Sequence, residues 1–145
     1  MPSKKTINFE IVTPERILLK TKILQVTVPT QEGDITVLPE HTPLVSSLKT
    51  GVLEITKEDG NLEIMSVAGG FLEVLLDKVV VLADNADRAQ EIDEKETEKA
   101  RRRAEDILKN LRDDDKEMFA EVSAQLEREL AKTKTIKRWR NVRKR

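Results

Sequence analysis

The 145-residue chain contains no cysteine, and this absence excludes disulfide bonds, thiol nucleophiles and thiolate metal sites. Tyrosine is also absent, and three Phe and one Trp are too few rings for the stacking platforms that bind single-stranded nucleic acid. The longest apolar runs, such as residues 79–83, are far shorter than the roughly 18 residues that a membrane span needs. The first six residues show no signal-peptide or transit-peptide pattern. We therefore expect a soluble protein that does not act on nucleic acid.

Proline and glycine are absent from the second half of the chain. All five Pro and all five Gly lie before residue 71, whereas residues 89–145 are rich in Ala, Glu, Lys and Arg. Nine basic and thirteen acidic side chains lie in residues 1–88, against seventeen and fourteen in residues 89–145. The two halves thus favour different secondary structures, and we expect a β domain over residues 1–88 and a helical domain over residues 89–145.

Short apolar runs alternate with turn residues in the first half. In residues 7–11 and 24–28 every second residue is apolar, which is the period of a half-buried strand. The pair Asp59-Gly60 predicts a tight hairpin turn. Further strands are predicted at residues 17–20, 34–38, 52–56, 62–67, 71–76 and 78–82. At least eight short strands without an intervening helix predict an antiparallel sandwich of two packed sheets.

The second half has the period of a helix. Apolar residues recur on one face of residues 89–111 and again on one face of residues 118–142. Two pairs are candidate caps for the start of the first helix: Asp87 with Gln90, or Asp93 with Glu96. The acidic run at residues 113–115 predicts a break between two helices. A short connection makes the helices an antiparallel hairpin, so the predicted fold class is α+β.

The hairpin is expected to bury little surface, because each apolar stripe is narrow and built partly of Ala. Two interpretations follow. The hairpin is either a solvated lid packed on the sandwich or an arm that occupies two positions, since weak packing permits both.

Residues 31–45 place two Pro, one Gly and the only His around one short strand, in the order Gln-Glu-Gly-Asp-Ile-Thr-Val-Leu-Pro-Glu-His-Thr-Pro-Leu-Val. This segment resembles the signature of the epsilon subunit family of the rotary F-type ATP synthase. Further matches follow in the same order at Gly51, residues 69–74, residues 79–84 and Ile92-Asp93. The resemblance covers nearly the whole chain.

The resemblance implies an N-terminal β-sandwich, a C-terminal two-helix domain and a non-catalytic subunit without a cofactor. Proteins of this family bind the central gamma subunit and the ring of membrane-embedded c subunits, and help couple proton flow to ATP synthesis. Their helical domain can extend into the catalytic head of alpha and beta subunits and block ATP hydrolysis. The alternative is a coupling and assembly subunit without inhibitory activity. In either case the chain would meet the membrane only through the complex, on the cytoplasmic face of a bacterial inner membrane.

The same resemblance assigns three side chains to the c ring. Glu32, Asp34 and His41 match the segment that faces the ring in the family, and Asp34 keeps the negative charge of the Glu that many relatives carry there. The alternative is that Pro39 and Pro43 only shape a loop that His41 caps. A metal site is not expected, because the lone His has no spaced His or Cys partner.

A regulatory ATP site is doubtful. Some relatives bind ATP through Ile/Leu-Asp-x-x-Arg-Ala at the start of the first helix, whereas this chain has Glu96 and Thr97 in place of the Arg and the Ala. A carboxylate repels phosphate where a guanidinium would pair with it. The residues that would form such a site are Ile92, Asp93, Arg101 and Arg102.

The end of the chain is strongly basic. Residues 130–145 carry eight cationic side chains and no acidic one. In the family, cations of the extended second helix meet an acidic segment of the beta subunits. The residues that would make this contact are Lys132, Lys134, Lys137, Arg138 and Arg140. The alternatives are a contact with anionic lipid or nucleic-acid phosphates, or a solvated end.

Two other motifs carry no catalytic prediction. Gly69-Gly70 lacks the Lys-Ser/Thr of a phosphate loop, so a close backbone approach or a bulge is predicted there. No Gly-x-Ser-x-Gly turn is present, and no nucleophile lies in sequence beside a base. The sequence therefore does not predict an enzyme.

Overall fold

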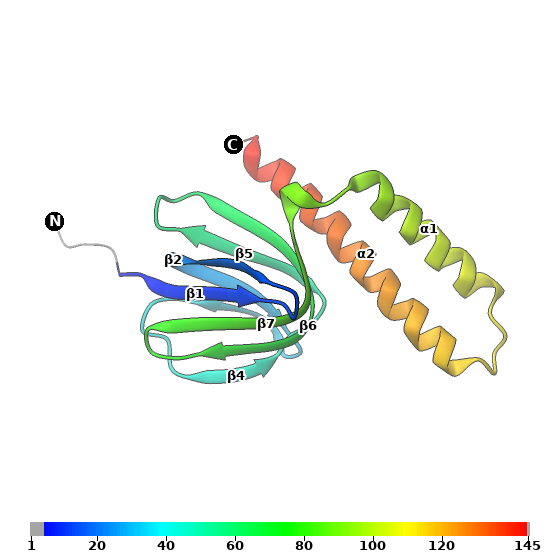
Figure 1. The fold of residues 1–145 in the computed structure, drawn as a ribbon, viewed down its shortest axis with the longest axis horizontal. Coiled ribbons are helices and arrows are strands. Elements are labelled where there is room, and N and C mark those ends of the chain that lie inside the picture. The colour runs from blue at the N-terminus through cyan, green and yellow to red at the C-terminus, as the bar shows by residue number, and fades with distance from the viewer. Residues whose placement is uncertain (1–4, 145) are drawn as a thin grey trace.

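The computed structural model describes residues 5–144, in which seven strands are followed by two helices (Figure 1). The strands are β1 (Ile7–Val12), β2 (Ile17–Thr30), β3 (Gly33–Val37), β4 (Leu44–Ser47), β5 (Gly51–Lys57), β6 (Leu62–Val74) and β7 (Lys78–Arg88). A short 3₁₀ turn, η1 (Ala89–Glu91), leads into α1 (Glu94–Asn110) and α2 (Lys116–Arg143). The predicted α+β fold, a sandwich followed by a helical hairpin, is confirmed.

The strands form a sheet that closes on itself. Its order is β1-β7-β6-β5-β2-β3, β4 pairs with β6, and a further pairing of β1 with β2 closes the path. All pairings are antiparallel except that of β1 with β7, which is parallel. The prediction of a purely antiparallel sandwich was wrong at this one pair. Apolar periodicity shows which residues face the core, but it carries no information about strand direction.

The number and length of the strands also differ from the prediction. The predicted strands at 17–20 and 24–28 are one strand, β2, and those at 62–67 and 71–76 are one strand, β6. Strand β4 was not predicted. Each long strand changes partners along its length: β6 pairs with β5 before its Gly pair and with β4 after it. A strand that contributes to both sheets of the sandwich does not keep one regular alternation of apolar residues along its length. The sequence pattern therefore predicts two short strands where the structure has one.

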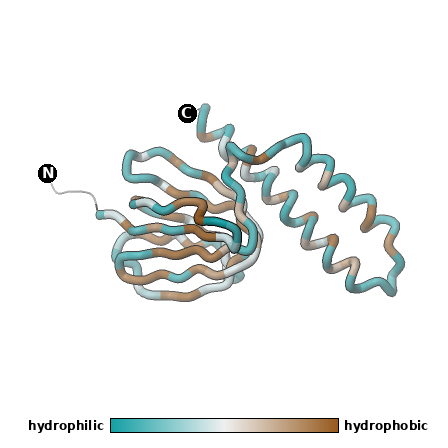
Figure 2. Tube along the Cα trace, in the orientation of Figure 1, coloured by the Kyte–Doolittle hydropathy of each residue, from teal (hydrophilic) through white to brown (hydrophobic). Residues whose placement is uncertain are grey.

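The hydrophobic core lies entirely inside the sandwich. Seventeen buried side chains form it, from Ile7 to Ala83, and none comes from the helices. Figure 2 shows apolar residues concentrated along the strands, whereas the helices are mostly hydrophilic. Burial of a large apolar side chain contributes roughly 1.5–3 kcal/mol, so the sandwich has its own source of stability.

The Gly pair lets two backbones approach closely. Both residues have positive φ, 67° at Gly69 and 111° at Gly70. A Cβ at Gly70 would lie 1.9 Å from the carbonyl oxygen of Leu82 on β7. The register of β6 with β7 continues through this point without a shift. Of the two predicted explanations, the structure shows the close approach.

Capping carboxylates define the starts of both helices. The Asp93 side chain accepts a hydrogen bond from the Glu96 backbone N–H at 3.1 Å, so Asp93 is the cap of α1. The other predicted candidate, Asp87, lies in β7. Asp115, the last residue of the predicted break, caps α2 by accepting from the backbone N–H of Met118 at 3.3 Å. The 28 residues of α2 give a helix about 42 Å long at roughly 1.5 Å per residue.

The hairpin contacts the sandwich through α2. This helix packs on β5, β6 and η1, whereas α1 packs on α2. Figure 1 shows the loop between the helices at the end of the hairpin that lies far from the sandwich. The predicted apolar stripe of the second helix is only partly buried, because Met118, Phe119 and Leu130 are exposed.

Candidate functional site

The tip of the β2–β3 hairpin presents the first two predicted site residues. Gly33 has a φ of 113°, and the Thr30 hydroxyl donates to the Gly33 carbonyl at 2.6 Å and accepts from the Glu32 N–H at 3.2 Å. These bonds hold a tight turn in which Glu32 is exposed. Asp34, the second residue of β3, is also exposed, so both carboxylates face solvent.

The third predicted residue, His41, follows the other end of β3. It closes a turn in which its backbone N–H donates to the Leu38 carbonyl at 3.2 Å. Glu40, with a φ of 67°, takes the left-handed position of this turn, and Pro39 precedes it. The arrangement is that of a type II turn. The ring Nδ1 donates to the Thr42 carbonyl at 2.7 Å, so Nε2 is the acceptor in the neutral ring.

Strand β3 separates the two parts of this predicted surface. Its five residues span about 17 Å at roughly 3.4 Å per residue. Glu32 precedes the strand and His41 follows it, so the structure does not bring them into one cluster. A binding partner would have to extend along β3 to contact both.

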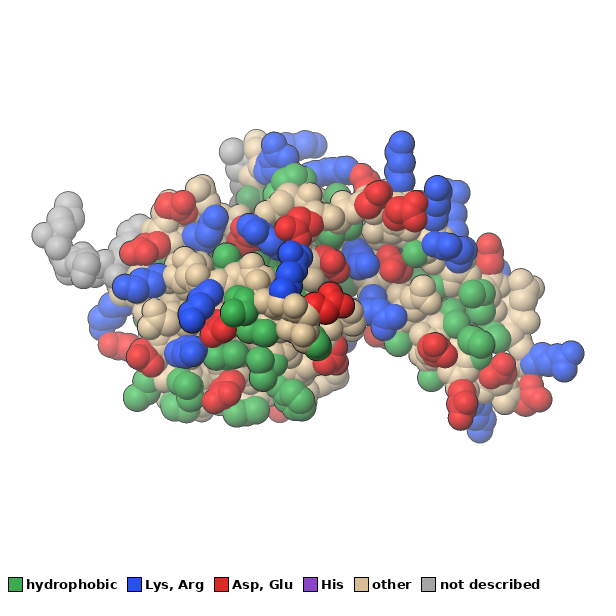
Figure 3. All heavy atoms as spheres, viewed as in Figure 1, with side chains coloured by type: hydrophobic (Ala, Val, Ile, Leu, Met, Phe, Trp, Pro, Cys, Tyr) green, Lys and Arg blue, Asp and Glu red, His purple; other side chains and the backbone are tan. Residues whose placement is uncertain are grey.

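A surface that the sequence analysis missed lies on the outer face of β4, β6 and β7. Val45, Phe71 and Leu82 are 70%, 56% and 49% exposed, and we call them the outer apolar patch. Phe71 and Leu82 are directly opposite each other in the β6–β7 register, and Val45 on β4 lies diagonally opposite Phe71. Figure 3 shows hydrophobic side chains gathered on the lower part of the sandwich. Contiguous apolar residues of this kind mark interaction surfaces.

The sequence does contain a signal for this patch. Residues 79–83 are apolar without interruption, and such a run indicates a strand that is apolar on both faces. Val79 and Val81 lie in the core, while Leu82 faces outward. The run predicts a strand but not its exposed face, because which face stays exposed depends on the other elements.

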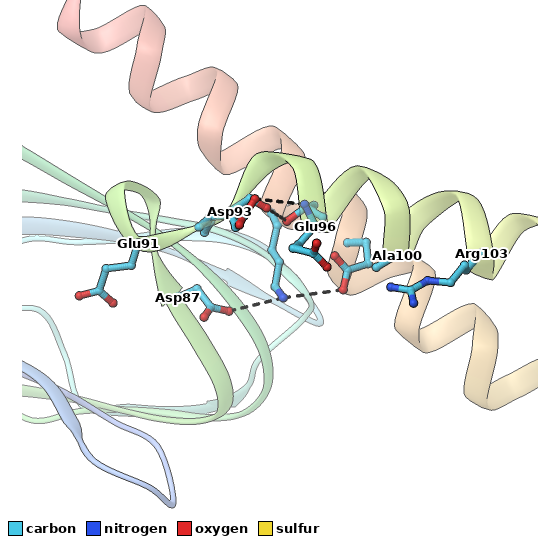
Figure 4. Close-up of a pocket in the computed structure, with 10 residues that line it drawn as sticks. Asp87, Glu91, Asp93, Glu96, Ala100 and Arg103 are labelled. Atoms are coloured by element: carbon cyan, nitrogen blue, oxygen red, sulfur yellow. Dashed lines mark hydrogen bonds and ion pairs between the residues drawn. The ribbon is translucent and has the colours of Figure 1, made fainter.

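A depression of about 250 Å³ lies between the end of β7, η1 and the two helices (Figure 4). Its charged lining is mostly acidic: Asp87, Glu91, Asp93, Glu96 and Glu129 against Arg103 and Lys132. The Lys132 ammonium lies 3.9 Å from the Asp87 carboxylate and 3.7 Å from that of Glu129. The excess of carboxylates opposes the binding of a polyphosphate.

The residues predicted for an ATP site are not gathered in this depression. Ile92 and Asp93 line it, but Asp93 also caps α1. Arg101 pairs instead with Glu98 and Glu105 of its own helix, and Arg102 Nε lies 3.1 Å from Glu98. Hydrogen bonds from Arg101 lower the pKa of Glu98 to about 2. These ion pairs direct both guanidinium groups along the helix surface.

The predicted cations of α2 divide into two groups. Arg138 Nε lies 2.6 Å from a Glu54 carboxylate oxygen on β5, and Arg140 Nη1 donates to Glu94 of α1 at 3.1 Å. Together with Lys132, these residues bind carboxylates outside α2. Lys134 and Lys137 are exposed and form no ion pair among residues 5–144.

Neither α1 nor α2, nor any other helix formed within residues 5–144, combines the length and the hydropathy that crossing a membrane requires. In the same part of the chain, no group of three or more His, Cys, Asp or Glu side chains is arranged to hold a metal ion.

Known proteins similar to this chain are ATP synthase subunits. The family described as ATP synthase, Delta/Epsilon chain, beta-sandwich domain matches residues 6–89. The ATP synthase epsilon chain of Dichelobacter nodosus is 40% identical over 100 residues, which are 69% of this chain and 70% of that protein. The ATP synthase epsilon chain of Alkalilimnicola ehrlichii is 36% identical over 140 residues, which are 97% of this chain and 99% of that protein.

Solved structures share the fold. A chain of the Euglena gracilis mitochondrial ATP synthase, in a structure of OSCP, F1 and c-ring, aligns with a TM-score of 0.77 at 23% identity, covering 90% of this chain and 81% of that chain. A chain of the central stalk and c-ring of the Tetrahymena thermophila mitochondrial ATP synthase aligns with a TM-score of 0.60 at 18% identity, covering 93% of this chain and 99% of that chain. From the family match and these relatives, the chain belongs to the family of epsilon subunits of the F-type ATP synthase.

Proposed function

We propose that this chain is a non-catalytic rotor subunit that binds the gamma subunit and the c ring through its sandwich and inhibits ATP hydrolysis through its hairpin. One observation carries the proposal: a long basic helix, α2, is docked on a sandwich whose core is complete without it. Such a helix can leave the sandwich without unfolding it. Its cations would then be available to an acidic segment of the catalytic head.

The outer apolar patch is the proposed surface for the gamma subunit. Phe71 is 56% exposed and points away from the core, so Phe71→Glu should preserve the fold and weaken binding to gamma. Ile107→Glu is the matched control, because Ile107 is 44% exposed and lies on α1, away from the patch. Binding of each variant to the isolated gamma subunit measures the effect. Equal affinities for the two variants would contradict the assignment.

Glu32, Asp34 and His41 are the proposed contacts with the c ring. Glu32 and Asp34 are exposed and His41 is half-buried, and hydrogen-bonded turns hold Glu32 and His41, which supports this assignment. Asp34→Asn should weaken association of the gamma-bound chain with membranes that contain the c ring. Glu58→Gln is the control, because Glu58 is exposed in the β5–β6 turn, away from β3. Unchanged association of the Asp34 variant would show that this carboxylate makes no contact.

ATP hydrolysis by the matching catalytic head and gamma subunit tests the inhibitory role. Three samples are compared: no added chain, the full chain, and a chain ending at Glu91, which keeps the Arg88 and Gln90 contacts with Glu63. Inhibition by the full chain alone would place the inhibitory element in the helices. If both forms bind gamma and neither inhibits, the chain is a coupling and assembly subunit only.

This function gives the chain a peripheral place on the cytoplasmic face of a bacterial membrane, where it takes part in coupling proton flow to ATP synthesis. A regulatory ATP molecule is not part of the proposal. The acidic lining of the depression beside α1 and the engagement of Arg101 with Glu98 and Glu105 both argue against it.

A further inference from the structure

The contact between α2 and the sandwich contains few large side chains. Ala131 and Thr135 are buried on α2, which packs against β6 and β5. On β6, Ile64, Ser66 and Ala68 alternate with core residues and are also buried, and only Ile64 of these three is a large apolar side chain. The short side chains remove little apolar area from water, so Ile64 supplies most of the apolar contribution of β6 to this contact. Polar contacts at the border add to that contribution and can shift how often α2 is docked.

Two ion pairs lie at that border, on the same face of the helix. Lys132 is three residues before Thr135 and Arg138 is three residues after it, a spacing that aligns side chains on one face. Arg138 donates to Glu54 of β5 at 2.6 Å, and Lys132 lies 3.9 Å from Asp87 of β7. The Arg138–Glu54 pair is shorter and only partly exposed, with 39% and 29% of its side chains accessible.

Both cations belong to the set that would bind the acidic partner in the undocked state. A guanidinium that is hydrogen-bonded to Glu54 is not available to a second carboxylate in the same geometry. We propose that Glu54, assisted by Asp87, is an internal substitute for the acidic partner of α2 and thereby holds the helix in its docked position. This inference rests on the proposed inhibitory function and assigns its regulation to named residues.

Lys134 and Lys137 provide the contrast. They lie on the exposed side of α2, where the docked state leaves them in solvent. Their neutralisation should weaken contact with an acidic partner and leave docking unchanged. Neutralisation of Glu54 should do the opposite: it releases α2 while every cation of the helix stays in place.

The first experiment measures docking in the full-length isolated chain. Because the chain has no cysteine, Lys20→Cys and Lys109→Cys provide two exposed spin-label sites, one on β2 and one on α1, for pulsed dipolar distance measurement. Glu54→Gln should raise the ratio of undocked to docked chains about fivefold, the effect of losing one partly buried ion pair. Lys137→Gln and the distant carboxylate variant Glu58→Gln should leave the ratio unchanged. Circular dichroism at 222 nm checks that the helices remain folded.

A charge exchange separates the ion pair from other effects of substitution. Arg138→Glu alone should release the helix, and adding Glu54→Arg should restore docking, because the pair is rebuilt with opposite polarity. Failure of this rescue, or an unchanged distance distribution in Glu54→Gln, would overturn the proposal. Neither result depends on the catalytic head, so neither bears on the inhibitory function.

The second experiment measures ATP hydrolysis by the matching head and gamma subunit. Glu54→Gln should inhibit at a concentration about fivefold lower than the unchanged chain does, in proportion to its undocked population. The charge-exchanged chain should dock normally and inhibit less, since its α2 has lost Arg138. Equal inhibition by these two variants would refute competition for the cation. Inhibition by no variant, with the docking shift observed, would instead refute the proposed inhibitory function.

Discussion

Arg88→Met should destabilise the sandwich far more than the loss of a surface charge. Arg88 Nε donates to a Glu63 carboxylate oxygen at 2.6 Å, and this bond raises the pKa of Arg88. Glu63 is only 6% exposed and lies on the same face of β6 as the core residues Met65 and Val67. Removal of the guanidinium leaves a buried carboxylate at the end of the core.

The size of the effect follows from burial and from the partners that remain. Removal of one member of a buried ion pair destabilises a protein by about 3–5 kcal/mol. Gln90 Nε2 at 3.3 Å and Lys57 Nζ at 3.9 Å stay near Glu63, so we expect the lower end, about 3 kcal/mol. If the sandwich unfolds as one cooperative unit, a loss of about 3 kcal/mol in its free energy of unfolding lowers the Tm by roughly 12–24 °C.

Urea unfolding and calorimetry of the full chain at pH 7 measure the change. Arg16→Met is the control, because the Arg16–Glu91 pair at 3.1 Å has side chains that are 59% and 44% exposed, and its loss should destabilise by less than about 1 kcal/mol. Adding Glu63→Leu to Arg88→Met should recover most of the loss, since no charge is then buried. Equal effects of the two Arg substitutions would refute the argument that burial of Glu63 determines the magnitude.

Three further predictions concern single positions. In urea unfolding, the Glu40→Gly variant should have a free energy of unfolding about 1 kcal/mol higher than the Glu40→Ala variant. Both variants lose the carboxylate, but only Gly adopts the φ of 67° without strain. Equal stability of the two variants would contradict a strained turn. Gly70→Ala should destabilise the fold by at least about 2 kcal/mol or prevent folding, because the new Cβ would meet the Leu82 carbonyl. A Tm near that of the unchanged chain would show that β6 and β7 can separate at this point. NMR titration should give the Glu98 carboxyl a pKa near 2, and Arg101→Gln should move this pKa toward the ordinary 4.5. Because the pKa of Glu98 is lowered in the folded chain, the Arg101–Glu98 pair contributes its full stabilisation above pH 4.5 and loses it as the pH falls toward 2.

Much of the fold could be predicted because its signals are local. The alternation in residues 7–11 and 24–28 marks strands, since neighbouring side chains of a strand point to opposite faces. Asp93 could be named as one of two candidate helix caps because the bond it makes is to a backbone N–H only three residues away. The family resemblance likewise rested on contiguous residues, those at 31–45 above all.

The predictions were wrong where the structure of a segment depends on neighbours that are distant in the sequence. Strand β6 changes neighbours at its Gly pair, so two predicted strands are one. The parallel pairing of β1 with β7 joins two strands that are far apart in the sequence, and nothing in either strand specifies the direction of the other. The outer apolar patch was missed because exposure depends on which elements cover a face.

The sequence by itself determined most of the strand segments, the order of a strand-rich half followed by two helices, and the family to which the chain belongs. These properties depend on side chains within a few residues of one another. Only the tertiary structure decided which apolar residues stay exposed and which carboxylate each cation binds. The Arg138–Glu54 pair spans 84 residues of sequence, and the partner of a charge at that separation depends on how the helix docks. Docking in turn depends on the shapes of two assembled surfaces, which no local pattern contains.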